Sequence, residues 1–176
     1  MKLERLRSYR CLILICLFLL SLVQFNSIAI ASNAKHAQPL RSFTGAWSDI
    51  SCPENEGSRC GGGFVLYLVQ KGDRICGTHF SSSLGAGQLD EGGPRSVTGK
   101  SKGSTALVSI TSGRDKSVFE ARIEITKKSI RWKRLKQLTL GDLDQSLIPE
   151  EAQLKKTVRE EDQEAFRHAV SDCGNL

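Results

Sequence analysis

The stretch LVQKGDRICGTHF, residues 68–80, has apolar residues on both sides of a turn signal, which is typical of a β-hairpin. Glycine readily takes the positive φ that a two-residue hairpin turn requires, and Gly72 lies within this turn signal. A turn at Lys71-Gly72 would place Leu68 opposite Ile75 in the next strand. The stretch also carries a cysteine, so its conformation determines what that sulfur can do.

A second pair of strands is predicted further along the chain. VFEARIEI, residues 118–125, alternates apolar and charged residues, which indicates a strand with one buried and one solvated face. SIRWKRL, residues 129–135, continues this pattern after a short turn. One register brings together an opposite-charge pair and an aliphatic–aromatic pair, both of which favour strand pairing. The expected partners are Ile125 and Ile130, Glu124 and Arg131, and Ile123 and Trp132.

Short strands separated by glycine-rich, serine-rich or charged turns extend over residues 43–136. They predict a mainly β fold of about seven strands, either a small antiparallel up-and-down β-barrel or a β-sandwich. Residues 137–176 are predominantly acidic and predict a C-terminal α-helical segment packed on this β domain. The helix is expected to begin at Pro149, because proline suits a first helical position and two glutamates follow it.

Residues 1–31 have the layout of a secretory signal peptide, with a basic start, an apolar run and a small-x-small cleavage pattern ending at Ala31. Cleavage after Ala31 would leave residues 32–42 as a flexible N-terminus, with no transmembrane span in the remainder. An uncleaved membrane anchor is the alternative. The leader predicts a protein that is exported, either to the periplasm or out of the cell.

Export determines how the cysteines are interpreted. Two of the six cysteines lie in the leader, and the even number that remains predicts disulfides in an oxidising compartment. Three connectivities are possible. We expect Cys76 to pair with Cys173, because this bond would tie the C-terminal helix to a central strand and close a long loop. Cys52 and Cys60 would then close the loop after the first strand.

A metal site or a catalytic thiol is the other interpretation of Cys76 and His79. Residues three apart on a strand point to opposite faces, so these two side chains cannot share one metal or one catalytic step. His79 shares a face with Leu66 and Leu68, and could contact a ligand at the mouth of a barrel. The sequence contains no catalytic constellation, no metal-ligand spacing and no cofactor motif.

The segment KKSIRWKRLK, residues 127–136, is strongly basic. One interpretation is a surface for an anionic lipid or cell-wall polymer, with Arg131 and Lys133 as contacts. Nucleic acid is not expected as a partner, because strand spacing points Trp132 inward, away from these outward charges. The other interpretation is the solvated face of an ordinary strand.

Gly45-Ala46-Trp47 opens the first expected strand, ahead of a strand meander and a C-terminal helix tied by a cysteine. In these features the chain resembles the calycin group, the lipocalin- and avidin-like barrels, and also other small exported bacterial proteins. The calycin resemblance implies an up-and-down barrel, often with a ligand in its cup, in which Trp47 would plug the closed end. Trp47, His79 and Trp132 are then the candidate ligand contacts.

These features predict an exported, non-catalytic binding protein. It would be either a calycin-like cup for a small apolar ligand or a module that binds another envelope protein, as inhibitors do. A basic protein associated with anionic envelope surfaces is one alternative, and an unrecognised hydrolase is another.

Overall fold

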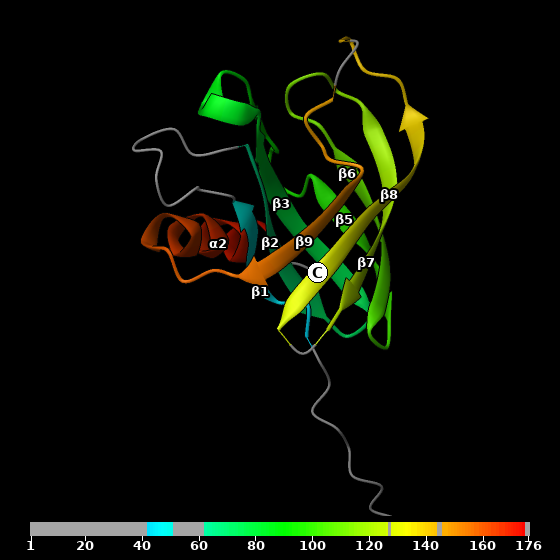
Figure 1. Cartoon of the computed structure of the whole chain (residues 1–176). Helices are drawn as coiled ribbons and strands as arrows, with labels where there is room; N and C mark the ends of the chain where they lie inside the picture. Colours follow the sequence, from blue (N-terminus) through cyan, green and yellow to red (C-terminus); the bar gives the residue numbers. More distant parts are fainter. Residues whose placement is uncertain (1–41, 51–61, 127, 144–145, 175–176) are drawn as a thin grey trace, which may run out of the picture. The chain divides into compact units, whose positions relative to one another are not determined.

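The computed structural model describes residues 42–50, 62–126, 128–143 and 146–174, and every structural statement below concerns these residues. The predicted leader and most of the predicted flexible N-terminus lie outside them. Nine strands, a short 3₁₀ turn and one α-helix lie within them (Figure 1). Their bounds are β1 Gly45–Ile50, β2 Gly63–Lys71, β3 Arg74–Ser82, η2 Leu84–Ala86, β4 Leu89–Glu91, β5 Val97–Lys102, β6 Thr105–Thr111, β7 Val118–Ile125, β8 Ser129–Thr139, β9 Glu151–Lys156 and α2 Glu160–Asp172.

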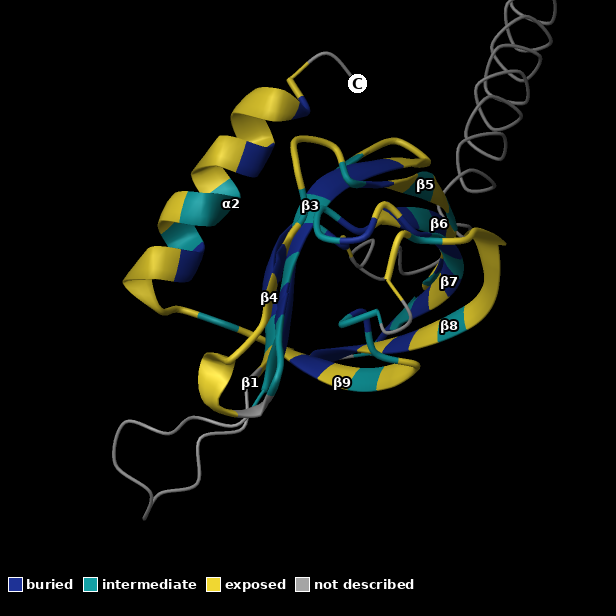
Figure 2. Ribbon diagram, turned by 90° about the horizontal axis from the view of Figure 1, so that it is seen from above, coloured by how far each residue is buried: buried dark blue, intermediate teal, exposed yellow. Residues whose placement is uncertain are grey.

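Eight of these strands close into an antiparallel barrel. The order around the barrel is β1, β2, β3, β5, β6, β7, β8 and β9, and β9 closes the ring by pairing with β1. The short strand β4 is not part of the ring and pairs only with β3. Figure 2 looks down the barrel and shows the strands as a ring, with α2 along its outside. The prediction of a mainly β, up-and-down barrel with a C-terminal helix is therefore confirmed, with more strands than expected. Among the described residues, no helix is long and apolar enough to cross a membrane.

The register predicted for β7 and β8 is confirmed. Ile123 lies opposite Trp132, and Glu124 lies opposite Arg131. The predicted register of the first hairpin is wrong by two residues, because the turn lies at Gly72-Asp73 and Leu68 pairs with Gly77 instead of Ile75. A shift of two keeps every side chain on its predicted face, because the strand repeat is two residues.

The barrel interior is filled by apolar side chains from all eight barrel strands. Within it, the rings of Phe64 and Trp132 pack edge to face, with centroids 5.1 Å apart. Counting both the interior and the outer face beneath the helix, the largest fully buried side chains are Trp132, Phe43, Leu66, Leu68, Ile75, Ile110, Ile123, Ile130, Ile148, Leu154, His79 and Val65.

The C-terminal segment differs from the prediction. No helix begins at Pro149. Strand β8 runs on to Thr139, across the predicted domain boundary between residues 136 and 137, and residues 151–156 form β9. Leu154 on β9 is fully buried and lies opposite Ile130, so this strand completes the wall of the barrel. The helix begins only at Glu160.

Helix α2 packs on the outside of the barrel over β1, β2 and β3. Its Ala169 joins a buried cluster with Val65 and Tyr67 of β2. Asp162, in the first turn of the helix, is almost fully buried. Its carboxylate accepts hydrogen bonds from the Tyr67 hydroxyl at 3.0 Å, the Thr157 hydroxyl at 2.7 Å and Arg159 Nε at 2.8 Å. The helix is thus fastened to the barrel at its N-terminal end by a polar contact.

Candidate functional site

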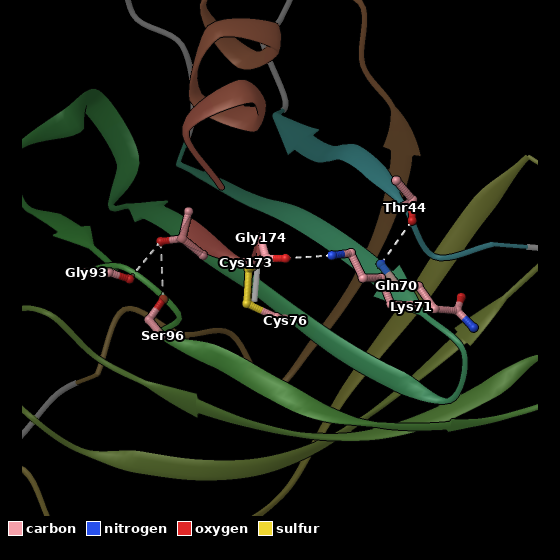
Figure 3. Close-up of a disulfide and its surroundings, with 9 residues drawn as sticks. Thr44, Gln70, Lys71, Cys76, Gly93, Ser96, Cys173 and Gly174 are labelled. Carbon is pink, nitrogen blue, oxygen red and sulfur yellow. Dashed lines mark hydrogen bonds between the residues drawn. A yellow bond between two sulfur atoms is a disulfide. The ribbon is translucent and has the colours of Figure 1, made fainter. Parts of the chain in front are cut away.

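The predicted disulfide between Cys76 and Cys173 is present and fastens the other end of α2 (Figure 3). It joins residues 97 apart in sequence whose Cα atoms are 5.9 Å apart, and both cysteines are fully buried. Cys76 points outward from β3, toward the helix and away from the barrel interior. Beside the bond, Lys71 Nζ donates a hydrogen bond to the Gly174 carbonyl oxygen at 2.7 Å. The predicted bond between Cys52 and Cys60 lies outside the described residues.

Both tryptophans that were predicted as ligand contacts belong to the packed core. Trp47 is 4% exposed, its indole nitrogen donates to the Phe43 carbonyl oxygen at 2.8 Å, and Lys156 Nζ lies 5.7 Å from its ring centre. Trp132 is 2% exposed and donates to the Pro149 carbonyl oxygen at 2.9 Å. Their polar atoms are satisfied within the protein, so neither ring is presented to an open cup.

His79 also points into the barrel, as predicted, but it is enclosed. Its side chain is fully buried, and its ring centre lies 6.5 Å from that of Phe64. Nδ1 shares a hydrogen bond with the Ser96 hydroxyl at 3.1 Å. Nε2 lies 3.5 Å from Asp90 Oδ1, an ion-pair distance if the ring is protonated, and makes no shorter hydrogen bond to the described residues.

Asp90 is the centre of this buried polar cluster. One carboxylate oxygen accepts from the Ser112 hydroxyl at 2.7 Å, and the other accepts from the backbone N–H groups of Gly113 and Arg114. Burial acts to raise the pKa of Asp90, but the contacts with His79 and Ser112 outweigh it and hold the pKa below its usual value. The cluster ties β3, β4 and the loop after β6 together at one end of the barrel.

A serine, a histidine and an aspartate thus lie in contact, which is the composition of many hydrolase sites. Here the space that a substrate would need is occupied. The Ser96 hydroxyl also contacts Thr78 Oγ1 at 3.2 Å, and Gly92 lies against the His79 ring so closely that a Cβ at that position would clash with Nδ1. This packing favours a structural role for the cluster over hydrolysis.

No local feature of the sequence connects Asp90 or Ser96 with His79. Asp90 lies on β4, Ser96 lies just before β5, and His79 lies on β3. Only the pairing of β4 and β5 with β3 brings them together. The nearest signal was the adjacent acidic pair Asp90-Glu91 in a glycine-rich stretch, which is ordinarily a hydrated loop.

The described part of the basic segment, residues 128–136, does not form a uniformly positive surface. On β8, Arg131 and Lys133 point outward, as predicted, but each faces a glutamate on a neighbouring strand. Two further bases on β8 are paired in the same way. The four ion pairs are Arg131 with Glu124 at 2.8 Å, Lys133 with Glu151 at 2.7 Å, Arg134 with Glu150 at 3.0 Å and Lys136 with Glu120 at 3.5 Å.

These paired charges line a hollow of about 560 Å³ on the outer face of β7, β8 and β9. Its walls alternate in sign, with Arg122 beside Glu124 and Lys133 beside Glu151. Two other hollows, of about 410 and 160 Å³, lie along the upper part of β8 and at the barrel rim beside Phe64. The two larger hollows are therefore lined mainly by charged side chains, on the outer face of the barrel.

In the described part of the chain, no three His, Cys, Asp or Glu side chains gather closely enough to hold a metal ion. No protein-family model matches the sequence, and neither the curated proteins nor the solved structures contain a match to it.

Proposed function

We propose that this protein is an exported, non-catalytic module that binds another protein, in the manner of small envelope inhibitors. The main support for this proposal over a ligand cup is that side chains fill the barrel interior. A calycin-like cup needs a cavity of several hundred Å³ within the barrel. Here the positions that would line such a cup hold large, tightly buried side chains such as Trp132 and Leu66.

Two other features support this choice. The disulfide and the Asp162 contacts fix α2 to the barrel at both ends, and a rigid scaffold loses little conformational entropy on binding. The largest of the three hollows lies outside the barrel and is lined by charges of both signs, which suits a folded partner with complementary charges. The leader-like residues 1–31 and the disulfide support export.

Titration with an apolar fluorophore, 1-anilinonaphthalene-8-sulfonate, separates this function from a ligand cup. We expect no saturable binding to the folded protein. An acid-expanded form of the same protein is the positive control, because such states expose apolar core surface and bind this dye. Stoichiometric binding to the unaltered protein would instead support a cup.

The partner is sought in an envelope extract of the source cell, with the immobilised mature protein as bait. We expect a single protein to be retained in a saturable complex that survives detergent. Retention only of lipids or cell-wall polymer would support the alternative of an envelope-surface protein. Export is tested by N-terminal sequencing of the protein from that fraction, which should begin at Ser32.

A further inference from the structure

The outer face of the barrel has one covered side and one bare side. Helix α2 lies over β1, β2 and β3, where it buries Val65 and Tyr67. Figures 1 and 2 agree that β6, β7 and β8 lie across the barrel from the helix. No described element covers this side, so its outward side chains form a continuous surface.

A row of neighbouring side chains runs from β3, at the edge of the helix-covered side, across β5 and onto this bare side. Arg74 on β3 lies opposite Lys100 on β5, Lys100 lies opposite Leu107 on β6, and Leu107 lies opposite Arg122 on β7. All four side chains are exposed. Directly opposed residues on one face have Cβ atoms about 5 Å apart, so the four side chains form one contiguous surface. We call Arg74, Lys100, Leu107 and Arg122 the basic row.

The basic row brings like charges close together. Arg74 and Lys100 are like charges directly opposite each other, an arrangement that destabilises a sheet. Among the described residues, neither they nor Arg122 forms an ion pair, whereas every base from Arg131 to Lys136 on β8 does. A partner that supplies carboxylates would relieve this repulsion.

The basic row also has an apolar centre. Leu107 is 48% exposed and lies between Lys100 and Arg122. An apolar centre within a polar rim is the usual layout of a protein–protein interface. The row leads into the 560 Å³ hollow, because Arg122 belongs to both.

We propose that the basic row binds a segment of a partner protein that carries acidic side chains around an apolar one. This inference rests on the proposed function and names its surface. A protein segment fits better than a uniform polyanion, because Glu124 and Glu151 in the adjoining hollow would repel one. It also fits better than an anionic lipid surface, because the same two carboxylates would repel the lipid headgroups.

The test measures the affinity of a fluorescent peptide of alternating glutamate and leucine by anisotropy, with polyglutamate and phosphatidylglycerol vesicles as competing probes. We expect Arg122→Glu to weaken peptide binding about tenfold and Leu107→Ser to weaken it several-fold, as hot-spot substitutions do. The matched control Arg167→Glu makes the same charge change on exposed α2, across the barrel, and should leave binding within about twofold. Circular dichroism and thermal unfolding verify that each variant is folded.

Three results would overturn the inference. Equal losses for Arg122→Glu and Arg167→Glu would mean that only net charge matters. Polyglutamate binding as tightly as the peptide would indicate a simple polyanion site, and binding to vesicles alone would indicate a membrane surface.

Repeating the envelope capture with Arg122→Glu as bait separates this inference from the proposed function. If the variant still retains the partner, the protein-binding function stands and the basic row is not its surface. If even the unaltered protein retains no partner, the proposed function itself fails.

Discussion

Removing the disulfide between Cys76 and Cys173 is the sharpest test of how the helix is held. The double variant Cys76→Ala/Cys173→Ala releases a constraint between residues 97 apart in sequence. In the chain-entropy model, closing a loop of about 100 residues contributes about 4.7 kcal/mol to stability. That amount is a large part of the 5–15 kcal/mol that is typical of a domain, so we expect a marginally stable protein.

Urea unfolding of the mature protein, followed by tryptophan fluorescence and circular dichroism, measures this loss. The two tryptophans lie in the barrel and report on its unfolding, while the signal at 222 nm also follows α2. The slope of the unfolding free energy against urea should rise in the variant, because its unfolded chain is less compact. Amide protons of α2 should exchange much faster, since a 13-residue helix is marginal on its own.

The matched control is Val69→Ala, because Val69 belongs to the same small buried cluster as the two cysteines. It removes packing without removing the link, and should cost about 1–2 kcal/mol at roughly 0.8 kcal/mol for each buried methylene-sized group. A loss in the double variant no greater than that of Val69→Ala would refute the reasoning. The bond would then act only as buried apolar volume.

Three further predictions concern single residues or pH. Asp162→Asn should lower stability by about 2 kcal/mol, because the hydrogen bonds that the charged carboxylate accepts are weakened, whereas exposed Glu161→Gln should change it by less than about 0.5 kcal/mol in urea unfolding. Burial acts to raise the pKa values of Asp90 and Asp162, but hydrogen bonds hold both below the usual range. These two carboxylates therefore contribute their full stabilisation above the unfolded-state pKa, near 4. The melting temperature should fall as the pH decreases below that value. A constant melting temperature between pH 5 and pH 2 would contradict this prediction. Gly77→Ala would push a Cβ into the main chain of β2 and cost about 2–3 kcal/mol by thermal unfolding, whereas Gly72→Ala, with φ of 61° and open space around it, should cost only about 1 kcal/mol.

The parts of the fold that sequence predicts best are those with strict local patterns. The alternation through residues 118–125, together with one charge pair, is sufficient to identify the register of β7 and β8. The first hairpin is predicted less well, because glycine at position 72 suits either the first or the second place in a two-residue turn. The inward face of β3 is still predicted correctly, since both registers share it.

The C-terminal strand could not be predicted from its own residues. Residues 149–156 have proline and two acids at their start, which locally favours a helix. What favours a strand here lies elsewhere in the chain, because β1 and β8 each have an edge that needs a hydrogen-bonded neighbour. Among the described strands, β9 pairs with both. Leu154 is the single fully buried residue of this strand, and one apolar residue is too weak a pattern.

The candidate sites show the same division between local and distant information. Sequence predicts which way His79, Arg131 and Lys133 point, because strand periodicity determines it. It does not identify the distant carboxylates that lie beside His79 and Lys133, which are Asp90 on β4 and Glu151 on β9. The basic row likewise follows only from the pairing of four strands.

The outward direction of Cys76 has a consequence for how the chain matures. A slip of β3 by one residue would reverse its faces and turn this thiol into the barrel, out of reach of Cys173. Oxidation would then fix only molecules in which β3 has its native register. Molecules with a shifted register would keep free thiols, which can undergo thiol–disulfide exchange until the strands pair correctly. We therefore expect the disulfide to form only in molecules with the native register of β3, and alkylation under non-reducing conditions would count the molecules that lack it.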